Sequence, residues 1–150
     1  MAAVGCNPAS TRPQFLPHPE APAGYVDAAR ERLTPELAAW LTAQGLAVQH
    51  ASVVDGFVET AWFDAERRRS YATRGDVPDL AATFKIRCWV APDVAGASRL
   101  VVEAVYRPVY DPSRPARDLE TLVPRDHEGH RMATALLEEM KKQFGVPPGR

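Results

Sequence analysis

The stretch that decides the fold is ATFKIRCWV, residues 82–90. Every second side chain from Phe84 to Val90 is apolar, and Lys85 and Arg87 stand between them. This alternation is typical of a strand with one face in a core and the other toward water. We therefore expect a half-buried strand whose core-facing side chains are Phe84, Ile86, Cys88 and Val90.

Three further segments show strand-like patterns on either side of this stretch. Residues 47–54 and 57–63 flank the dipeptide Asp55-Gly56, which favours a tight β-hairpin. Residues 99–109 alternate in the same way, with Leu100 on one side and Val101 on the other. The connections are short enough for hairpins, so the four segments predict a four-stranded antiparallel meander.

Helical spacing appears before and after the strands. Thr34 and Pro35 form a helix-start signal for a helix over residues 35–44, and Gly45 suits its end. A second helix is expected over residues 131–144, after a cap at Asp126 and before Gly145. The apolar side chains expected to meet the sheet are Leu37, Trp40, Leu41, Leu136, Leu137 and Met140.

The predicted fold class is α+β, with the N-terminal and C-terminal helices packed on one face of the sheet. The chain has 150 residues, which suits a single domain. Residues 1–24 read as a proline-rich flexible leader or tether, residues 25–146 as the domain and residues 147–150 as a tail.

Charge and hydropathy exclude several classes of function. The net charge of −1 provides no field to attract nucleic acid, so no nucleic-acid partner is expected. The apolar runs are far shorter than the ~20 residues that a membrane-spanning helix needs. Arg67, Arg68 and Arg69 are interpreted as a solvated charge run in a loop, because no glycine-rich turn accompanies them.

Candidate catalytic and metal-binding groups are few. The segment from Asp126 to His130 superficially resembles the zinc-protease motif, but His127 and His130 are three residues apart and the motif requires four. We expect no metal and no cofactor. Cys88 is interpreted as a packed core thiol, because alternation places its charged neighbour Arg87 on the opposite face. An enzyme would require His50, Asp55 or Glu103 to meet in one cleft.

Alternation also places apolar side chains on the outer face of the predicted sheet. These candidate partner-binding residues are Phe57, Phe63, Trp89, Val101 and Val105. Exposed apolar residues grouped on one sheet face mark partner surfaces. Two outcomes stay open: the residues form such a surface, or segments containing Phe15 and Leu16, or Val109 and Tyr110, fold back over them.

The N-terminal segment carries a resemblance. Ala3-Val4-Gly5-Cys6 resembles the tail of a lipobox, and a proline-rich tether follows it. With the helix, four strands and final helix, and with Val123–His127 before that helix, the chain resembles small bacterial envelope lipoproteins. Over residues 33–145 the order of elements is similar to the helix-grip domains of the C subunit of the β-barrel assembly machinery, an outer-membrane lipoprotein.

The resemblance implies a non-catalytic domain in the bacterial cell envelope, attached to the membrane by a lipid on Cys6 and facing the periplasm. Its partner is expected to be another envelope protein or a cell-wall component. The alternative is a soluble helix-grip module that holds a small apolar ligand between the sheet and the last helix. Without a signal segment upstream, the expected location is the cytoplasm.

Overall fold

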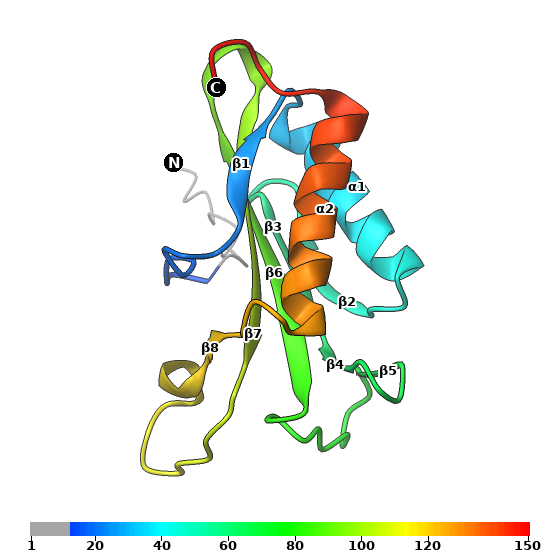
Figure 1. Cartoon of the computed structure of the whole chain (residues 1–150), viewed down its shortest axis with the longest axis vertical. Helices are drawn as coiled ribbons and strands as arrows, with labels where there is room; N and C mark the ends of the chain where they lie inside the picture. The colour runs from blue at the N-terminus through cyan, green and yellow to red at the C-terminus, as the bar shows by residue number, and fades with distance from the viewer. Residues whose placement is uncertain (1–12) are drawn as a thin grey trace, which may run out of the picture.

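The computed structural model describes residues 13–150, in which two helices lie against one face of an antiparallel sheet (Figure 1). The elements in chain order are β1 (Ala23–Val26), α1 (Arg30–Ala43), β2 (Val48–Ser52), β3 (Phe57–Thr60), β4 (Trp62–Asp64), β5 (Arg69–Tyr71), β6 (Thr83–Pro92), β7 (Ser98–Tyr106), β8 (Thr121–Leu122) and α2 (Glu128–Phe144). Two short 3₁₀ helices, η1 (Val94–Gly96) and η2 (Ala116–Leu119), lie on either side of β7 in the sequence.

The α+β class and the antiparallel sheet are confirmed, whereas the prediction of four strands is wrong, since the sheet has eight. The main path is β1-β7-β6-β3-β2, in which β2, β3, β6 and β7 pair in the expected order. β1 adds an edge strand beyond β7. β4, β5 and β8 extend the end of the sheet at which β6 begins and β7 finishes.

The predicted strand over residues 57–63 is interrupted in the middle. Glu59 of β3 pairs with Arg87, but Phe63 of β4 pairs with Phe84, so the register with β6 shifts by one residue. The hydroxyl of Thr60 bridges the break, because it accepts a hydrogen bond from the Ile86 backbone N–H at 3.0 Å. One extra residue turns the following side chains to the other face of the sheet.

The first helix begins five residues earlier than Thr34-Pro35 predicts. Ala29 occupies the N-cap position, and Thr34 lies inside α1 as a buried residue. Pro35 removes one helical N–H, but the helix continues through it. We attribute this to the buried stripe of Leu33, Leu37 and Leu41, whose spacing of four keeps all three on one face.

The second helix also starts earlier than expected, at Glu128. His127, not Asp126, is its N-cap, and the imidazole Nδ1 accepts a hydrogen bond from the Gly129 N–H at 3.0 Å. The end is as predicted, because α2 finishes before Gly145, whose φ of 86° is unfavourable for other residues.

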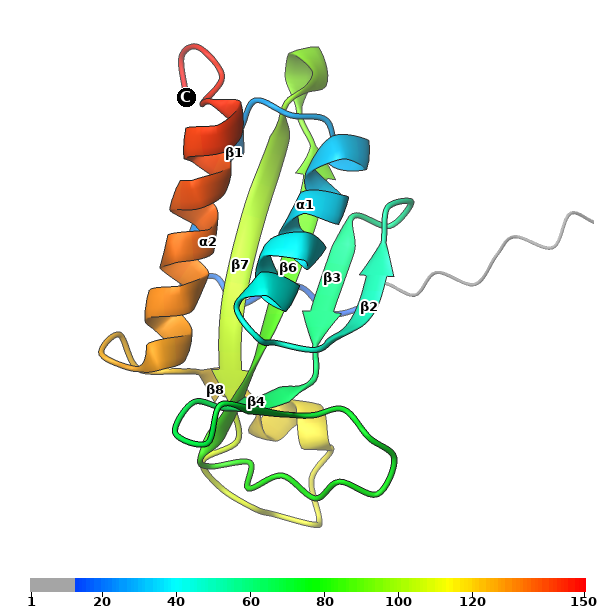
Figure 2. The same ribbon diagram turned by 90° about the vertical axis from the view of Figure 1, so that its right-hand side faces the viewer.

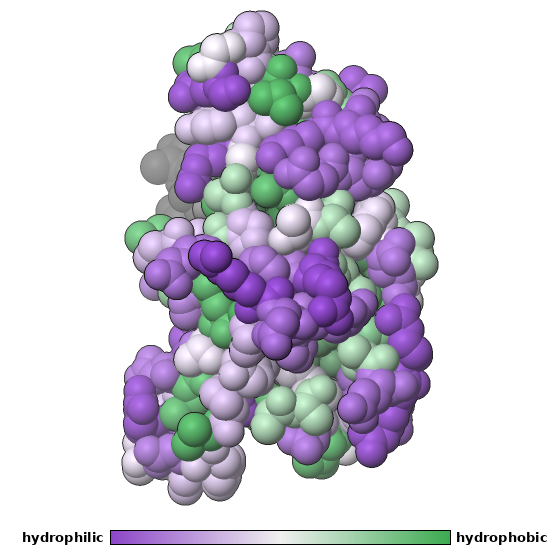
Figure 3. All heavy atoms as spheres, viewed as in Figure 1, coloured by the Kyte–Doolittle hydropathy of each residue, from purple (hydrophilic) through white to green (hydrophobic). Residues whose placement is uncertain are grey.

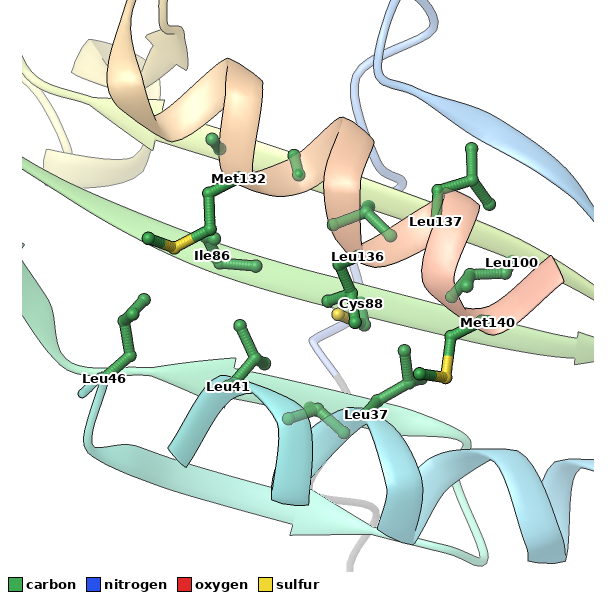
Figure 4. Close-up of a cluster of buried hydrophobic side chains, with 14 of the residues drawn as sticks. Leu37, Leu41, Leu46, Ile86, Cys88, Leu100, Met132, Leu136, Leu137 and Met140 are labelled. Atoms are coloured by element: carbon green, nitrogen blue, oxygen red, sulfur yellow. The ribbon is translucent and has the colours of Figure 1, made fainter. Parts of the chain in front are cut away.

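The two helices share one core with the inner face of the sheet (Figure 4). Side chains of α1 and α2 point toward one another across β6, and Figure 2 shows both helices in front of the sheet. Of the residues predicted for this core, Trp40 is only partly buried. The predicted core residues that are buried are Phe84, Ile86, Cys88, Val90, Leu100, Leu37, Leu41, Leu136, Leu137 and Met140.

Candidate ligand-binding site

Two irregular loops meet at the end of the sheet that carries β4 and β8. One is residues 72–82, between β5 and β6, and the other is residues 107–115, between β7 and η2. The Arg107 N–H donates to the Leu80 carbonyl oxygen at 2.9 Å and joins the loops. Prolines in both loops remove backbone N–H donors, which opposes the pairing of these loops as further strands of the sheet.

Between the loops lies a mainly apolar cavity of about 560 Å³. Its lining includes the apolar side chains of Val77, Leu80, Val109, Tyr110 and Leu119. Val77, Val109 and Tyr110 are 88%, 62% and 84% exposed, so these side chains are not packed into the protein's own core and can contact a ligand. Figure 3 shows apolar surface at its lower left, over the loop that follows β7 in Figure 1.

The cavity also has four charged side chains, and three of them are already engaged. Asp79 accepts from the Ala81 N–H at 3.0 Å, and Asp111 accepts from the N–H and hydroxyl of Ser113. Arg107 donates to Glu120 at 3.0 Å. The exposed side chain of Arg114 donates a 3.3 Å hydrogen bond to the Asp118 carbonyl oxygen and forms no ion pair among residues 13–150. The Asp111 carboxyl is nevertheless close enough to feel this charge, because hydrogen bonds from Ser113 and, to a smaller extent, the charge of Arg114 lower its pKa.

This cavity is not where a helix-grip ligand site was expected. The interface between the sheet and α2 contains buried side chains from both, among them Ile86, Leu136 and Met140. Sequence reasoning missed the loop cavity because its residues follow no helical or strand period. The available signal was a set of apolar side chains, including Val77 and Tyr110, inside otherwise polar and proline-rich loops.

The predicted partner-binding residues are buried, so they form no exposed surface in this structure. Phe57, Trp89 and Val101 make a small cluster on the outer face, with exposed fractions of 1%, 2% and 4%. Phe15 and Ala21 pack with this cluster. For Phe15, the second of the two open outcomes therefore holds, because the segment that contains it folds back over the outer face. Leu16 does not take part, since it is 82% exposed.

The other two predicted residues are placed differently. Val105 is fully buried on β7 and is not in that cluster. Phe63 lies on the opposite face of the sheet, in the main core, because the register shift after Thr60 reverses its direction. Its assignment to the outer face is therefore wrong.

Beside the outer apolar cluster lies a network of charged side chains. Arg87 donates from Nε to Glu59, and its Nη1 donates to Glu120 at 2.7 Å and Glu103 at 3.4 Å. Arg107 and Arg117 also donate to Glu120, at 3.0 and 2.9 Å. Lys85 lies 3.6 Å from Glu59, and burial lowers the pKa of its ammonium group. The ion pairs and hydrogen bonds of this network offset the free-energy cost of removing these charges from water.

The groups required for a catalytic cleft are not brought together. His50 is exposed on the edge strand β2, and Asp55 lies in the following turn, where it accepts from the Ser52 hydroxyl at 2.9 Å. Glu103 is fully buried on β7, and β3 and β6 separate that strand from β2.

His127, immediately before the last helix, has a structural role. His127 caps α2, and the centroid of its ring lies 5.5 Å from that of Phe84 and 6.1 Å from that of Tyr106. Burial, with a smaller contribution from the charge of Arg131, lowers the pKa of His127. Within residues 13–150 no group of three or more His, Cys, Asp or Glu side chains could hold a metal ion.

The two cysteines have separate outcomes. Cys88 is a free, fully buried thiol, which confirms its interpretation as a core residue, and burial raises its pKa. Cys6 lies outside the described residues. In the described part of the chain, no helix combines the length and apolar character needed to cross a bilayer.

Comparison with known proteins adds no family to these observations. No protein-family model matches the chain, and the comparison with curated proteins found no significant match.

Proposed function

We propose that this chain is a non-catalytic binding domain whose site is the loop cavity between residues 72–82 and 107–119. The observation that carries the proposal is the cavity itself, which at about 560 Å³ falls within the range of pockets that hold small molecules. Its lining is mainly apolar, and its charged side chains do not form a nucleophile–base pair. These features suit binding better than covalent chemistry.

The ligand class that fits is a small apolar molecule with one anionic group. Val77, Leu80 and Val109 provide apolar contact for its body. Arg114 provides an exposed guanidinium that forms no direct ion pair in the described chain, so a ligand carboxylate can bind it in competition with the nearby charge of Asp111.

A matched pair of probes tests this proposal. Decanoate and 1-decanol have the same chain length and differ in the head group, so calorimetric titration of each separates apolar from ionic binding. We expect saturable binding of decanoate, and Arg114→Gln should weaken decanoate without weakening decanol. Heat changes that do not saturate with either probe would contradict the proposal.

A second pair of variants locates the binding. Val109→Ser removes an apolar contact from the cavity lining, whereas Val94→Ser makes the same change at an exposed position in η1, outside the lining. Only Val109→Ser should weaken decanoate. Equal effects of the two variants would show that the probe binds elsewhere.

We also propose that the domain is attached to the bacterial cell envelope through a lipid on Cys6, where its ligand or partner is an envelope component. The supporting observation is the sequence Ala3-Val4-Gly5-Cys6 followed by a proline-rich segment. A diacyl or triacyl group would hold the domain firmly, because each buried methylene contributes about 0.8 kcal/mol.

Expression of the complete genomic reading frame in a bacterial host tests the anchor. We expect cleavage before Cys6, a mass increased by the lipid, and release into the soluble fraction by Cys6→Ser. Cys88→Ala removes the other cysteine and should leave the lipid in place. An intact Met1 with an unmodified Cys6 would contradict the anchor without affecting the cavity proposal.

A further inference from the structure

Residues 13–22 lie across the outer face of the sheet, and we call this segment the strap. Its main side-chain contact is Phe15, whose ring sits below the guanidinium carbon of Arg117 at 3.4 Å and near that of Arg87 at 5.2 Å. The Phe15 ring also meets the edge of Trp89, with the ring centroids 6.2 Å apart. Arg87, Arg117 and Trp89 thus form a slot for one aromatic side chain.

The strap is otherwise held by few bonds. Its sequence, PQFLPHPEAP, has four prolines, each of which lacks a backbone donor. The His18 N–H donates to Glu103 at 2.9 Å, and the Pro22 carbonyl oxygen accepts from the Val102 N–H at 2.9 Å. A longer bond of 3.4 Å runs from Nη2 of Arg117 to the Leu16 carbonyl oxygen. This is the pattern of proline-rich ligands, which dock an extended chain into aromatic-lined grooves through a few anchors.

The fit between strap and sheet is incomplete. The Nε2 atom of His18 and the Nε1 atom of Trp89 are both buried, and neither has a hydrogen-bond partner in the described part of the chain. A buried donor or acceptor without a partner opposes the contact that buries it. A different segment with the same anchors and a partner for Trp89 would fit this face better.

We infer that this face is a recognition site for an extended, proline-flanked segment with one aromatic side chain. The strap is the occupant supplied by the chain itself, and a similar segment of a partner protein displaces it. The aromatic ring of the partner enters the slot between Arg87 and Arg117, and a hydrogen-bond acceptor on that segment meets Trp89. This inference does not rest on the loop cavity.

The strap sequence itself is the probe for the first test. A fluorescently labelled peptide, PQFLPHPEAPAG, is titrated against the full-length wild-type chain and against the Phe15→Ser variant, with fluorescence anisotropy as the readout. In the variant the intramolecular aromatic anchor is missing, so we expect it to bind the peptide at least about tenfold more tightly than the wild type. A peptide with serine in place of phenylalanine should not bind either protein.

Two results would overturn the inference. One is a folded Phe15→Ser protein, shown by an unchanged far-UV circular dichroism spectrum, that does not bind the peptide. The other is equal binding of the phenylalanine and serine peptides, which would show that the slot does not select an aromatic side chain.

Hydrogen exchange of the wild-type chain provides a test that does not depend on a variant. If the strap detaches while the sheet stays folded, the His18 amide should exchange at least about a hundredfold faster than the Cys88 amide in β6. Its rate should also depend little on low concentrations of denaturant. Exchange of both amides at one common rate would show that the strap opens only with global unfolding, and the inference would be wrong.

Discussion

The Nη1 atom of Arg87 lies 2.7 Å from the carboxylate of Glu120, and this bond ties a central strand of the sheet to the segment between η2 and β8. Glu120 also accepts hydrogen bonds from Arg107 and Arg117. One buried carboxylate therefore holds three arginines, which come from β6, from the loop after β7 and from η2. The first two predictions concern this network.

Acid should weaken the fold through Glu120. Burial opposes ionisation of this carboxyl, but the bonds from Arg87, Arg107 and Arg117 outweigh burial and lower its pKa from 4.5 to about 2. A depressed folded pKa stabilises the fold above the unfolded value, and this contribution is lost as the pH falls from about 4.5 to about 2. The two pKa values correspond to roughly 3 kcal/mol of unfolding free energy.

Urea denaturation at a series of pH values measures this loss. Glu120→Gln is the control, because it cannot ionise and should show a smaller loss of stability across the same pH range. Identical pH profiles for the variant and the wild type would assign the acid sensitivity to other groups.

Arg87→Met should destabilise the fold strongly. Arg87 contacts Glu59, Glu103 and Glu120, so its removal takes a positive charge away from three carboxylates that lie within the structure. Removing one partner of a buried ion pair costs about 3–5 kcal/mol. The same substitution at Arg99, which is exposed on β7, should change the unfolding free energy by less than about 0.5 kcal/mol. Similar losses for both variants in guanidinium denaturation would contradict the network's role.

Trp89→Ala should cost about 3–5 kcal/mol of unfolding free energy, as is typical when a large buried aromatic residue is truncated. Trp89 is 2% exposed, and its ring packs on Phe57 with centroids 5.3 Å apart. Thermal or chemical denaturation measures the loss. A melting temperature close to that of the wild type would show that this indole ring is free in solution.

Gly129→Ala should destabilise α2 although alanine is the better helix former. An added Cβ at Gly129 would lie 2.9 Å from Cδ2 of Phe84, closer than side-chain packing allows, and 3.2 Å from Cβ of Ala104, which is also a tight contact. We expect a cost of about 1–3 kcal/mol, typical of overpacking. Thr134→Ala on the exposed face of the same helix should be neutral within a few tenths of a kcal/mol or slightly stabilising. Increased stability of Gly129→Ala would show that the helix can move away from the sheet.

The main elements could be predicted because their residues repeat with a clear period. The alternation from Phe84 to Val90 specifies a central strand, and the stripe through Leu136 and Met140 specifies α2. Gly145 ends α2 as predicted, and a hairpin forms at Asp55-Gly56. The hairpin is less tight than predicted, because β2 ends at Ser52 and residues 53–56 form a four-residue connection.

The remaining strands could not be predicted because they are too short to show a period. β8 has two residues, β5 has three and β1 has four. Alternation also cannot reveal a register shift such as the one before Phe63, because the shift depends on pairing with β6. The exposure of the outer-face side chains was inferred from the strands alone. The strand pattern contains no information on where Phe15 packs, so its contact with this face could only be stated as an alternative.

For a domain anchored through Cys6, as proposed above, the strap would also limit how far the domain can stand from the membrane. In the docked state, chain length that would otherwise separate Cys6 from β1 is folded against the sheet. Released from the sheet, residues 13–22 would become a free segment that spans at most about 35 Å when fully extended. For a domain anchored through Cys6, as proposed here, partner binding at the outer face would thus be coupled to reach: the occupied domain could touch structures farther from the bilayer than the free domain.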